Sequence, residues 1–301
     1  MGIPLNIDPD KQPFELYEDI DYKRFWSGWQ QRKMDQAEHA VVQIMLPKSG
    51  RRILDLGCGY GRLSDCYLGR FSQIVMYDGS LPFLKEACQR TDGKAIYIAG
   101  DIQRLPFRAG SFDSITMIRV LHHIQDDKSC LSELHRILSD GGMLVFTYRN
   151  KMYLKNVLSQ LTHPERGGLF SLEPSGVETT LISHHPEYIR RQLHNNGFTN
   201  LRHQGLGVFD RIANMIKPWG KFAPTGKRLA PVFGKIKIAP WMFCSAIARG
   251  NTDLIKSENI DDLLMCLVCS GDVKKDVNSY KCISCGQNYP IVDGILDFRV
   301  S

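Results

Sequence analysis

Short apolar runs alternate along the chain with segments whose apolar residues recur at helical spacing. The runs predict strands at 52–56, 73–78, 95–99, 114–118, 142–148, 199–209 and 241–248. The periodic segments predict helices at 36–45, 82–90, 128–138 and 186–195, and a further helix is expected near 61–68. Gly141 and Gly142 are expected to end the helix at 128–138. Such alternation is typical of a parallel sheet covered by helices on both faces.

Three glycines follow the first predicted strand. Residues 53–62 read ILDLGCGYGR, with glycine at 57, 59 and 61. A turn with few side chains lets a ligand approach the backbone and reach N–H groups at the start of a helix. The spacing departs from the G-x-G-x-x-G of dinucleotide-binding folds, which needs glycine at position 62. We therefore predict a nucleotide-binding loop, and the spacing disfavours a pyrophosphate ligand.

Acidic residues lie at the ends of the first two predicted strands. Asp55 is in the first and Asp78 ends the second. Together they indicate a ligand with a cationic part and a ribose, because an acidic residue about 20 positions beyond the glycines binds ribose hydroxyls in dinucleotide folds. The motif D-L-G-C-G-x-G followed by this aspartate resembles the class I S-adenosylmethionine-dependent methyltransferases.

The resemblance covers about residues 51–249. It implies a Rossmann-like, doubly wound α/β fold with a mostly parallel seven-stranded sheet, whose last two strands form a hairpin at one edge. It also implies S-adenosylmethionine as cofactor, with Asp101 accepting from the adenine amino group and Ile102 packing on the ring. The residues expected to bind the cofactor are Asp55, Gly57, Cys58, Gly59, Gly61, Asp78, Gly79, Asp101, Ile102 and Arg119.

The fourth predicted strand ends near Arg119, His122 and His123, where the resemblance places methyl transfer. In-line displacement from a sulfonium needs a base only when the acceptor must lose a proton. Histidine titrates near neutrality, so His123 or His122 is a candidate base, and the alternative is that one of them orients the loop or packs on the cofactor. Adjacent residues on a strand end are expected to point to opposite sides. Arg119 either binds an anionic acceptor or pairs with a nearby carboxylate.

The length of 301 residues suits one large and one small domain, and the composition is ordinary for a globular protein. No apolar run reaches the roughly 18–20 residues of a membrane helix and no secretory signal is visible, so a cytoplasmic location is expected. Residues 1–50 are expected to form a helical lid segment, in which Tyr17, Tyr22 and Trp26 either line the cleft or belong to the core. Domain boundaries are expected at 51–249 for the catalytic domain, 250–262 for an acidic linker and 263–301 for a zinc ribbon.

The net charge of +6 is unevenly spread. Residues 211–249 contain eight Lys or Arg and no acidic residue, whereas residues 251–301 contain eight acidic and five basic residues. The basic stretch is either a solvated face or a surface for an anionic substrate, nucleic acid or anionic lipid.

Two C-x-x-C pairs stand near the C-terminus with twelve residues between them: Cys266 with Cys269, and Cys282 with Cys285. Four thiolates at this spacing predict a tetrahedral, structural Zn²⁺ site. The tail Tyr289–Phe298 resembles the small zinc-ribbon activator proteins that pair with tRNA, rRNA and translation-factor methyltransferases. The module is expected to pack in cis on the catalytic domain or to bind a partner protein.

The favoured function is methyl transfer from S-adenosylmethionine to a small-molecule or lipid-like metabolite, with residues 149–185 carrying acceptor specificity. The alternative is methylation of tRNA, rRNA or a translation factor, with the zinc ribbon as activator or recognition module. A third hypothesis is a binding or scaffold protein that keeps the fold without turnover.

Overall fold

The computed structural model describes residues 29–163, 168–176, 181–206 and 237–299. Tyr17, Tyr22, Trp26 and most of the basic stretch lie outside these residues. The helices are α2 (Trp29–Met45), α3 (Leu81–Arg90), α4 (Asp127–Ile137), α5 (Leu154–Thr162) and α6 (Pro186–Asn195), with short 3-10 helices η2 (Ser64–Cys66), η3 (Leu121–His123) and η5 (Ile260–Leu263). None of the described helices is long and apolar enough to cross a membrane.

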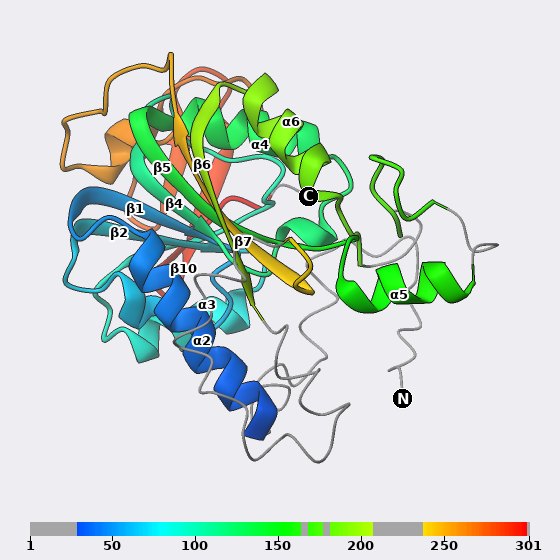
Figure 1. The fold of residues 1–301 in the computed structure, drawn as a ribbon. Coiled ribbons are helices and arrows are strands. Elements are labelled where there is room, and N and C mark those ends of the chain that lie inside the picture. The colour runs from blue at the N-terminus through cyan, green and yellow to red at the C-terminus, as the bar shows by residue number, and fades with distance from the viewer. Residues whose placement is uncertain (1–28, 164–167, 177–180, 207–236, 300–301) are drawn as a thin grey trace.

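Eleven strands form one mixed sheet in the order β6-β7-β5-β4-β1-β2-β3-β11-β10-β9-β8 (Figure 1). Their bounds are β1 (Gly50–Leu56), β2 (Phe71–Asp78), β3 (Ile96–Ala99), β4 (Phe112–Met117), β5 (Leu138–Arg149), β6 (Phe198–Leu206), β7 (Trp241–Ala248), β8 (Val273–Lys275), β9 (Ser279–Cys282), β10 (Asn288–Val292) and β11 (Ile295–Asp297). Strands β1 to β5 are parallel, and the predicted antiparallel hairpin of β6 and β7 follows β5.

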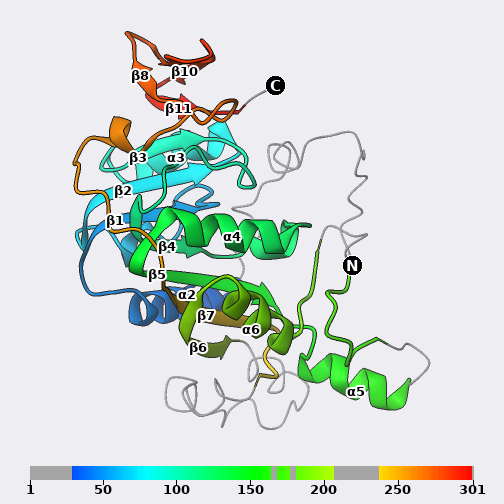
Figure 2. The same ribbon diagram turned by 90° about the horizontal axis from the view of Figure 1, so that it is seen from above.

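The prediction of a seven-stranded sheet is wrong in extent. The expected strands are present, but β3 is not an edge, because β11 pairs with it in parallel through Leu296 opposite Ile98 and Asp297 opposite Ala99. Backbone N–H and C=O groups on a free strand edge are a template for another strand, and here the C-terminal module supplies it. Figure 2 shows that module beyond β3 at one side of the sheet and β6 at the other.

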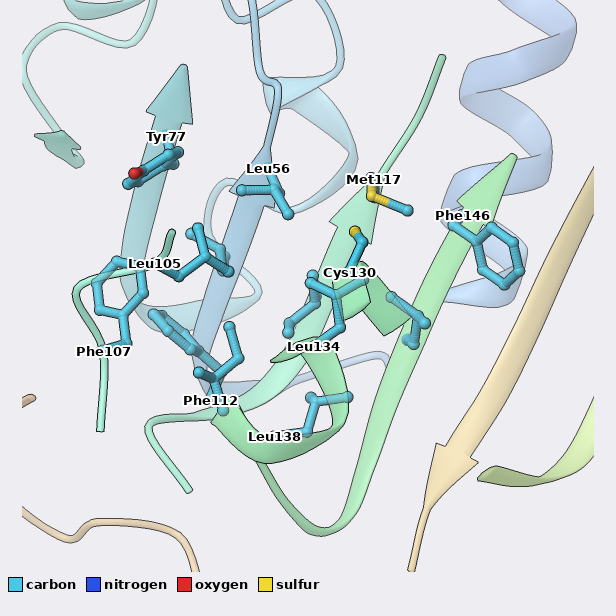
Figure 3. Packing of buried hydrophobic residues seen from close by; sticks show 14 of the residues in the cluster. Leu56, Tyr77, Leu105, Phe107, Phe112, Met117, Cys130, Leu134, Leu138 and Phe146 are labelled. Carbon is cyan, nitrogen blue, oxygen red and sulfur yellow. The ribbon is translucent and has the colours of Figure 1, made fainter. Parts of the chain in front are cut away.

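Alternate residues of the strands enter two apolar clusters, one on each face of the sheet. Leu54 and Leu56 of β1 belong to one cluster, and Ile53 belongs to the other. This follows from the two-residue repeat of a strand. Helices α4 and α6 cover the first cluster, part of which is shown in Figure 3, and α2 and α3 cover the second. The doubly wound α/β prediction is therefore confirmed.

Two local predictions are wrong. The expected helix at 61–68 is a series of turns with only the three-residue η2, and α2 packs against this segment. Gly141 and Gly142 do not end α4, which stops at Ile137. They lie inside β5, and Gly141 has φ +75°. A bulge forms there, because Leu138 and Met143 of β5, five positions apart, pair with Phe112 and Ser114 of β4, only two positions apart. Helix α5 was not predicted.

Residues 250–262 run across the ends of the sheet at which the parallel strands begin. Ile255 N–H donates to Gly110 O at 3.0 Å, in the turn before β4. Arg52 is fully buried at the start of β1, and its guanidinium donates to Ser111 O at 2.8 Å and to Ser257 O. The linker is thus fastened to the sheet on its way to the four-cysteine module (residues 263–299).

Replacing Arg52 with Met should lower the free energy of unfolding by about 3 kcal/mol, because buried carbonyl oxygens left without a donor cost about 1–3 kcal/mol each. Its neighbour Arg51, which pairs with the exposed carboxylate of Glu258 at 2.6 Å, is the matched control. Arg51→Met should cost no more than about 1 kcal/mol. Urea unfolding followed by far-UV circular dichroism measures both losses of stability. Equal losses would contradict the assignment of the buried linker contact to Arg52.

Candidate functional site

A cavity of about 160 Å³ opens at the carboxyl ends of β1, β2, β3 and β4. Parallel α/β sheets bind ligands at this edge. Most of the predicted cofactor residues line it, together with apolar neighbours that were not predicted. The lining residues are Gly57, Gly59, Asp78, Gly79, Phe83, Gly100, Asp101, Ile102, Gln103, Ile118, Arg119, Val120, His123 and Ile124.

The glycine turn forms one wall of this cavity. Gly57, Gly59 and Gly61 all have positive φ, between +53° and +74°. A Cβ on Gly57 would lie 2.3 Å from Val120 Cγ2, whereas a Cβ on Gly59 would meet no atom within 4 Å. Glycine is therefore required at position 57 by both conformation and space. Because no α-helix follows, the backbone of the turn itself faces the ligand, which corrects the expected helix start.

Asp78 is held by backbone donors at the end of β2. Its Oδ2 accepts from Gly59 N–H at 2.8 Å and its Oδ1 from Ser80 N–H at 3.0 Å. Burial raises the pKa of this carboxyl, although the backbone hydrogen bonds oppose that shift. Each carboxylate oxygen has a further acceptor position, so Asp78 can still accept hydrogen bonds from a ligand hydroxyl.

Asp101 and Ile102 occupy the loop after β3. Asp101 Oδ1 accepts from Gln103 N–H at 2.9 Å, and Tyr77 Oη donates to Asp101 O at 3.0 Å. A Cβ on Gly100 would lie 2.0 Å from Tyr77 Oη, so glycine there lets the tyrosine reach the loop. Both predicted residues face the large cavity.

Asp55 lies on the far side of the glycine turn, in a smaller cavity of about 40 Å³ that shares Gly57, Gly59 and Ile118 with the larger one. Tyr67 Oη donates to its Oδ2 at 2.6 Å and Thr116 Oγ1 to its Oδ1 at 2.9 Å. Burial raises the pKa of Asp55 to about 6 against these two hydrogen bonds. Cys58 lines the same cavity, and burial raises the pKa of its thiol well above the usual value.

The two histidines lie on η3 rather than on a strand end. Their ring centroids are 3.9 Å apart, so the expectation that they point to opposite sides is wrong. His123 lines the large cavity, whereas His122 is buried behind it. Burial, and after it the nearby His123 and Arg119, lowers the pKa of His122 well below its usual range. The neutral imidazole of His122 therefore packs behind the ring of His123, which faces the cavity.

Arg119 pairs with a carboxylate, the second of the two sequence interpretations. Its Nε donates to Glu38 Oε1 at 2.8 Å, its Nη2 donates to the same oxygen, and its Cζ lies 3.6 Å from the ring centroid of Trp241. Sequence reasoning missed Glu38. The signal was available, since an acidic residue three and four positions before the buried Val41 and Val42 lies on the inner face of a helix.

The segment at 149–185, expected to carry acceptor specificity, lines a further cavity of about 510 Å³ beside α5. Lys151 is buried in its wall, and its Nζ donates to Ser171 O at 3.1 Å and Glu173 O at 2.7 Å. His184 is fully buried with its Nε2 3.0 Å from Asp127 Oδ2. These contacts give the segment a polar interior.

The four predicted metal ligands come together. The Sγ atoms of Cys266, Cys269, Cys282 and Cys285 all lie within 4.8 Å of one another. Zn–S bonds of about 2.3 Å in a tetrahedron place sulfur atoms roughly 3.8 Å apart, so this donor set suits a zinc ion. Val268 N–H points at Cys266 Sγ and Ser284 N–H at Cys282 Sγ, both at 3.4 Å, which stabilises thiolates.

Comparison with known proteins finds a similarity to methyltransferases in part of the chain. Residues 54–146 match the model of a family described as a methyltransferase domain. The match runs from β1 through most of β5 and includes the glycine turn, Asp78, Asp101 and both histidines. It confirms the resemblance to methyltransferases for this part of the chain.

Malonyl-[acyl-carrier protein] O-methyltransferase of Salmonella typhimurium is 33% identical over 113 residues, which are 36% of this chain and 45% of that protein. Demethylmenaquinone methyltransferase of Renibacterium salmoninarum is 36% identical over 105 residues, 35% of this chain and 44% of that protein. The chain thus spans less than half the length of these relatives.

One solved structure with a similar fold is a chain in the complex between the Haloferax volcanii Trm112 methyltransferase activator and the putative methyltransferase. The TM-score is 0.51 and the identity 21%, over 73% of this chain and 91% of that chain. This likeness supports the Rossmann-like fold.

The raised pKa of Asp55 predicts a pH dependence of stability. The folded protein holds this proton more tightly than the unfolded chain, so ionisation removes stability as the pH rises from about 4 to about 6, and the loss persists above that. A rise from 3.8 to about 6 corresponds to about 3 kcal/mol. The free energy of unfolding of Asp55→Asn, relative to that of the parent, should therefore be higher at pH 7.5 than at pH 4.5. Urea unfolding at the two pH values measures this difference.

Asp126 provides the opposite control. Hydrogen bonds from Ser129 lower the pKa of this exposed carboxylate at the start of α4, so its contribution is lost as the pH falls. Asp126→Asn should lose stability relative to the parent above pH 5. An Asp55→Asn difference that does not change with pH would contradict the assigned shift.

Proposed function

We propose that the chain is an S-adenosylmethionine-dependent methyltransferase whose four-cysteine module holds a structural zinc ion. The observation that carries the proposal is the large cavity within the methyltransferase domain, where the glycine turn, Asp78 and Asp101 meet. Its position and acidic lining suit a nucleoside with a cationic substituent.

Each residue has a role in this proposal. Asp78, already fixed by two backbone N–H groups, accepts from the ribose hydroxyls, and Asp101 accepts from the adenine amino group while Ile102 packs on the ring. Gly57 and Gly59 expose the backbone to the ligand. Asp55 supplies negative charge across the turn, where an amino-acid ammonium group would lie. When bound, S-adenosylmethionine supplies a methyl group already activated by its sulfonium.

The protein's remaining task is to align the acceptor and exclude water. His123 is the candidate base, because it reaches the cavity, while His122 packs against it from the buried side. A base is required only for an acceptor that loses a proton on methylation.

We favour a small-molecule or lipid-like acceptor. The two curated relatives are named for a malonyl group on a carrier protein and for demethylmenaquinone, which supports this class. Methylation of RNA or a translation factor remains the alternative, motivated by the basic stretch at 211–249 and by the four-cysteine module. Within the described part of that stretch, Arg249 lies 3.6 Å from Asp140, so this cation is already paired with a carboxylate.

Two contacts support a role for the four-cysteine module in stabilising the cofactor site in cis. Phe298 N–H donates to Ala99 O at 2.7 Å, immediately before the loop that carries Asp101. Arg104 in the same loop donates to Leu267 O at 3.0 Å, between the first two cysteines. The module therefore contacts the loop from both its strand and its metal-binding turn.

Zinc removal tests this role. The purified chain should contain one zinc ion by elemental analysis, and Cys282→Ser should lose the metal and lower the melting temperature. S-adenosylhomocysteine should also bind more weakly, because the loop with Asp101 loses its support. Cys88→Ser, at a half-buried thiol outside the cluster, is the control. A metal-free parent protein, or an unchanged melting temperature in Cys282→Ser, would rule out a structural zinc.

Methyl transfer tests the function. Labelled methyl from S-adenosylmethionine, incubated with the enzyme and a cell extract, should enter the small-molecule or lipid fraction. Asp78→Asn should transfer little label and bind S-adenosylhomocysteine at least about tenfold more weakly in calorimetry, since hydrogen bonds to a charged group contribute about 1.5–3 kcal/mol. Asp92→Asn, at an exposed turn, should behave as the parent.

The fraction that takes the label decides between the hypotheses. Label in RNA or protein would favour the alternative acceptor class. Binding without transfer to any fraction would favour a scaffold protein, and absence of binding would refute the proposed function.

A further inference from the structure

The polar face of α2 contacts the segment that follows the glycine turn. Asp35, Glu38 and His39 are spaced i, i+3 and i+4, which puts them on one side of the helix. All three contact Arg62, the residue after Gly61: Glu38 Oε2 accepts from its Nη2 at 2.7 Å, Asp35 pairs with its Nη1, and His39 Nε2 lies 3.0 Å from its carbonyl oxygen. Helix α2 thus holds the turn from behind.

The same Glu38 side chain also holds Arg119, at the end of β4. Oxygen Oε1 accepts from Nε and Nη2 of Arg119, while Oε2 serves Arg62. One carboxylate therefore joins two arginines that come from different strand ends. Each arginine lines a cavity: Arg62 the smaller one and Arg119 the larger one.

Arg119 adopts a backbone conformation that needs such support. Its φ is +64°, a region rarely populated by residues with a Cβ, and such strain persists where surrounding contacts impose it. Those contacts are the ion pair with Glu38, a 2.7 Å hydrogen bond from Arg119 N–H to Thr147 Oγ1, and the stacking on Trp241. Of these three, the ion pair is the one that reaches α2.

Burial makes Glu38 the critical member of this network. Its side chain is 0% exposed, against 10% for Arg62, 12% for Arg119 and 30% for Asp35. Removing one partner of a buried ion pair leaves the other charge uncompensated, which is strongly unfavourable. Here one carboxylate faces two guanidinium groups, so its loss would leave Arg119 without its carboxylate partner and Arg62 with Asp35 alone.

Ring contacts continue from Arg119 to the candidate base. Trp241 beneath the guanidinium lies edge-on to His122, with ring centroids 5.0 Å apart, and the His122 ring packs at a tilt against that of His123, with centroids 3.9 Å apart. The position of the His123 ring at the cavity wall thus depends on a continuous series of packed groups that begins at α2.

We propose that Glu38 is the positioning residue of the ligand cavity: its single buried carboxylate fixes the turn segment through Arg62 and the His122–His123 wall through Arg119. The inference rests on the proposed function only for the identity of the ligand used to probe the site. Formation of the cavity then depends on the docking of α2, although none of the described α2 side chains lines the larger cavity.

Glu38→Gln is the informative substitution, because glutamine keeps the shape but replaces one acceptor oxygen by an amide donor that opposes a guanidinium. Binding of S-adenosylhomocysteine should weaken at least tenfold in calorimetry. Asp35→Asn is the matched control, on the same helix face and paired with the same Arg62 but more exposed. It should change affinity less than threefold. Circular dichroism and zinc content establish that each variant is folded.

Two further measurements separate positioning from general destabilisation. The imidazole proton resonances of His122 and His123 should shift in folded Glu38→Gln but not in Asp35→Asn. In Glu38→Gln/Arg119→Met, one uncompensated charge is gone, so the added effect of Glu38→Gln should be smaller than in the parent. The double variant keeps the inference testable if Glu38→Gln alone does not fold.

Parent-like affinity and unshifted histidine resonances in folded Glu38→Gln would overturn the inference. So would strictly additive effects in the double variant. If the parent itself does not bind S-adenosylhomocysteine, the proposed function fails, whereas tight binding by both parent and Glu38→Gln removes only this inference.

Discussion

The hydrogen bond from Gly59 N–H to the Asp78 carboxylate joins the ends of β1 and β2, and the cavity depends on it. The register of the two parallel strands brings Leu56 opposite Tyr77, so the turn after one strand meets the residue that ends the other. Glycine at position 57 lets the turn pass under Val120, and the turn then presents its backbone N–H to the carboxylate. The backbone of the turn and the carboxylate of Asp78, which we propose to bind the ligand, are thus positioned by each other.

Much of this arrangement could be predicted from the sequence, because it follows from local pattern. Strand periodicity located β1 to β7 closely, and the glycines with Asp78 and Asp101 indicated the edge where the cavity lies. Contacts between distant segments could not be predicted in the same way. Three contacts join residues that are far apart in sequence: the pairing of β11 with β3, the linker contact with Arg52 and the ion pair of Glu38 with Arg119. No periodic pattern in one sequence indicates such contacts. The helix expected after the glycines failed for a related reason, since α2 packs against that segment.

Three of the buried charged side chains differ in how their charge is compensated. Arg52 donates to Ser111 O before β4 and to Ser257 O of the linker, so backbone carbonyl groups stabilise its charge. Glu38 is compensated by two guanidinium groups. Asp55 receives only two hydroxyl donors, and its raised pKa records that incomplete compensation. Of the three, Asp55 is the carboxylate that gains from a cationic ligand, which is consistent with its position beside the cavity rather than within the scaffold.

The pairing of β3 with β11 also bears on how the protein is synthesised. β3 is complete once residue 99 has left the ribosome, but its outer neighbour is made about 200 residues later, and contacts of such long sequence separation form slowly. During translation, β3 exposes an unpaired edge and the loop with Asp101 has no contact from Phe298. A nascent chain can therefore fold most of the sheet before the loop with Asp101 gains its contact from Phe298, and emergence of β11 from the ribosome sets the moment at which that contact forms.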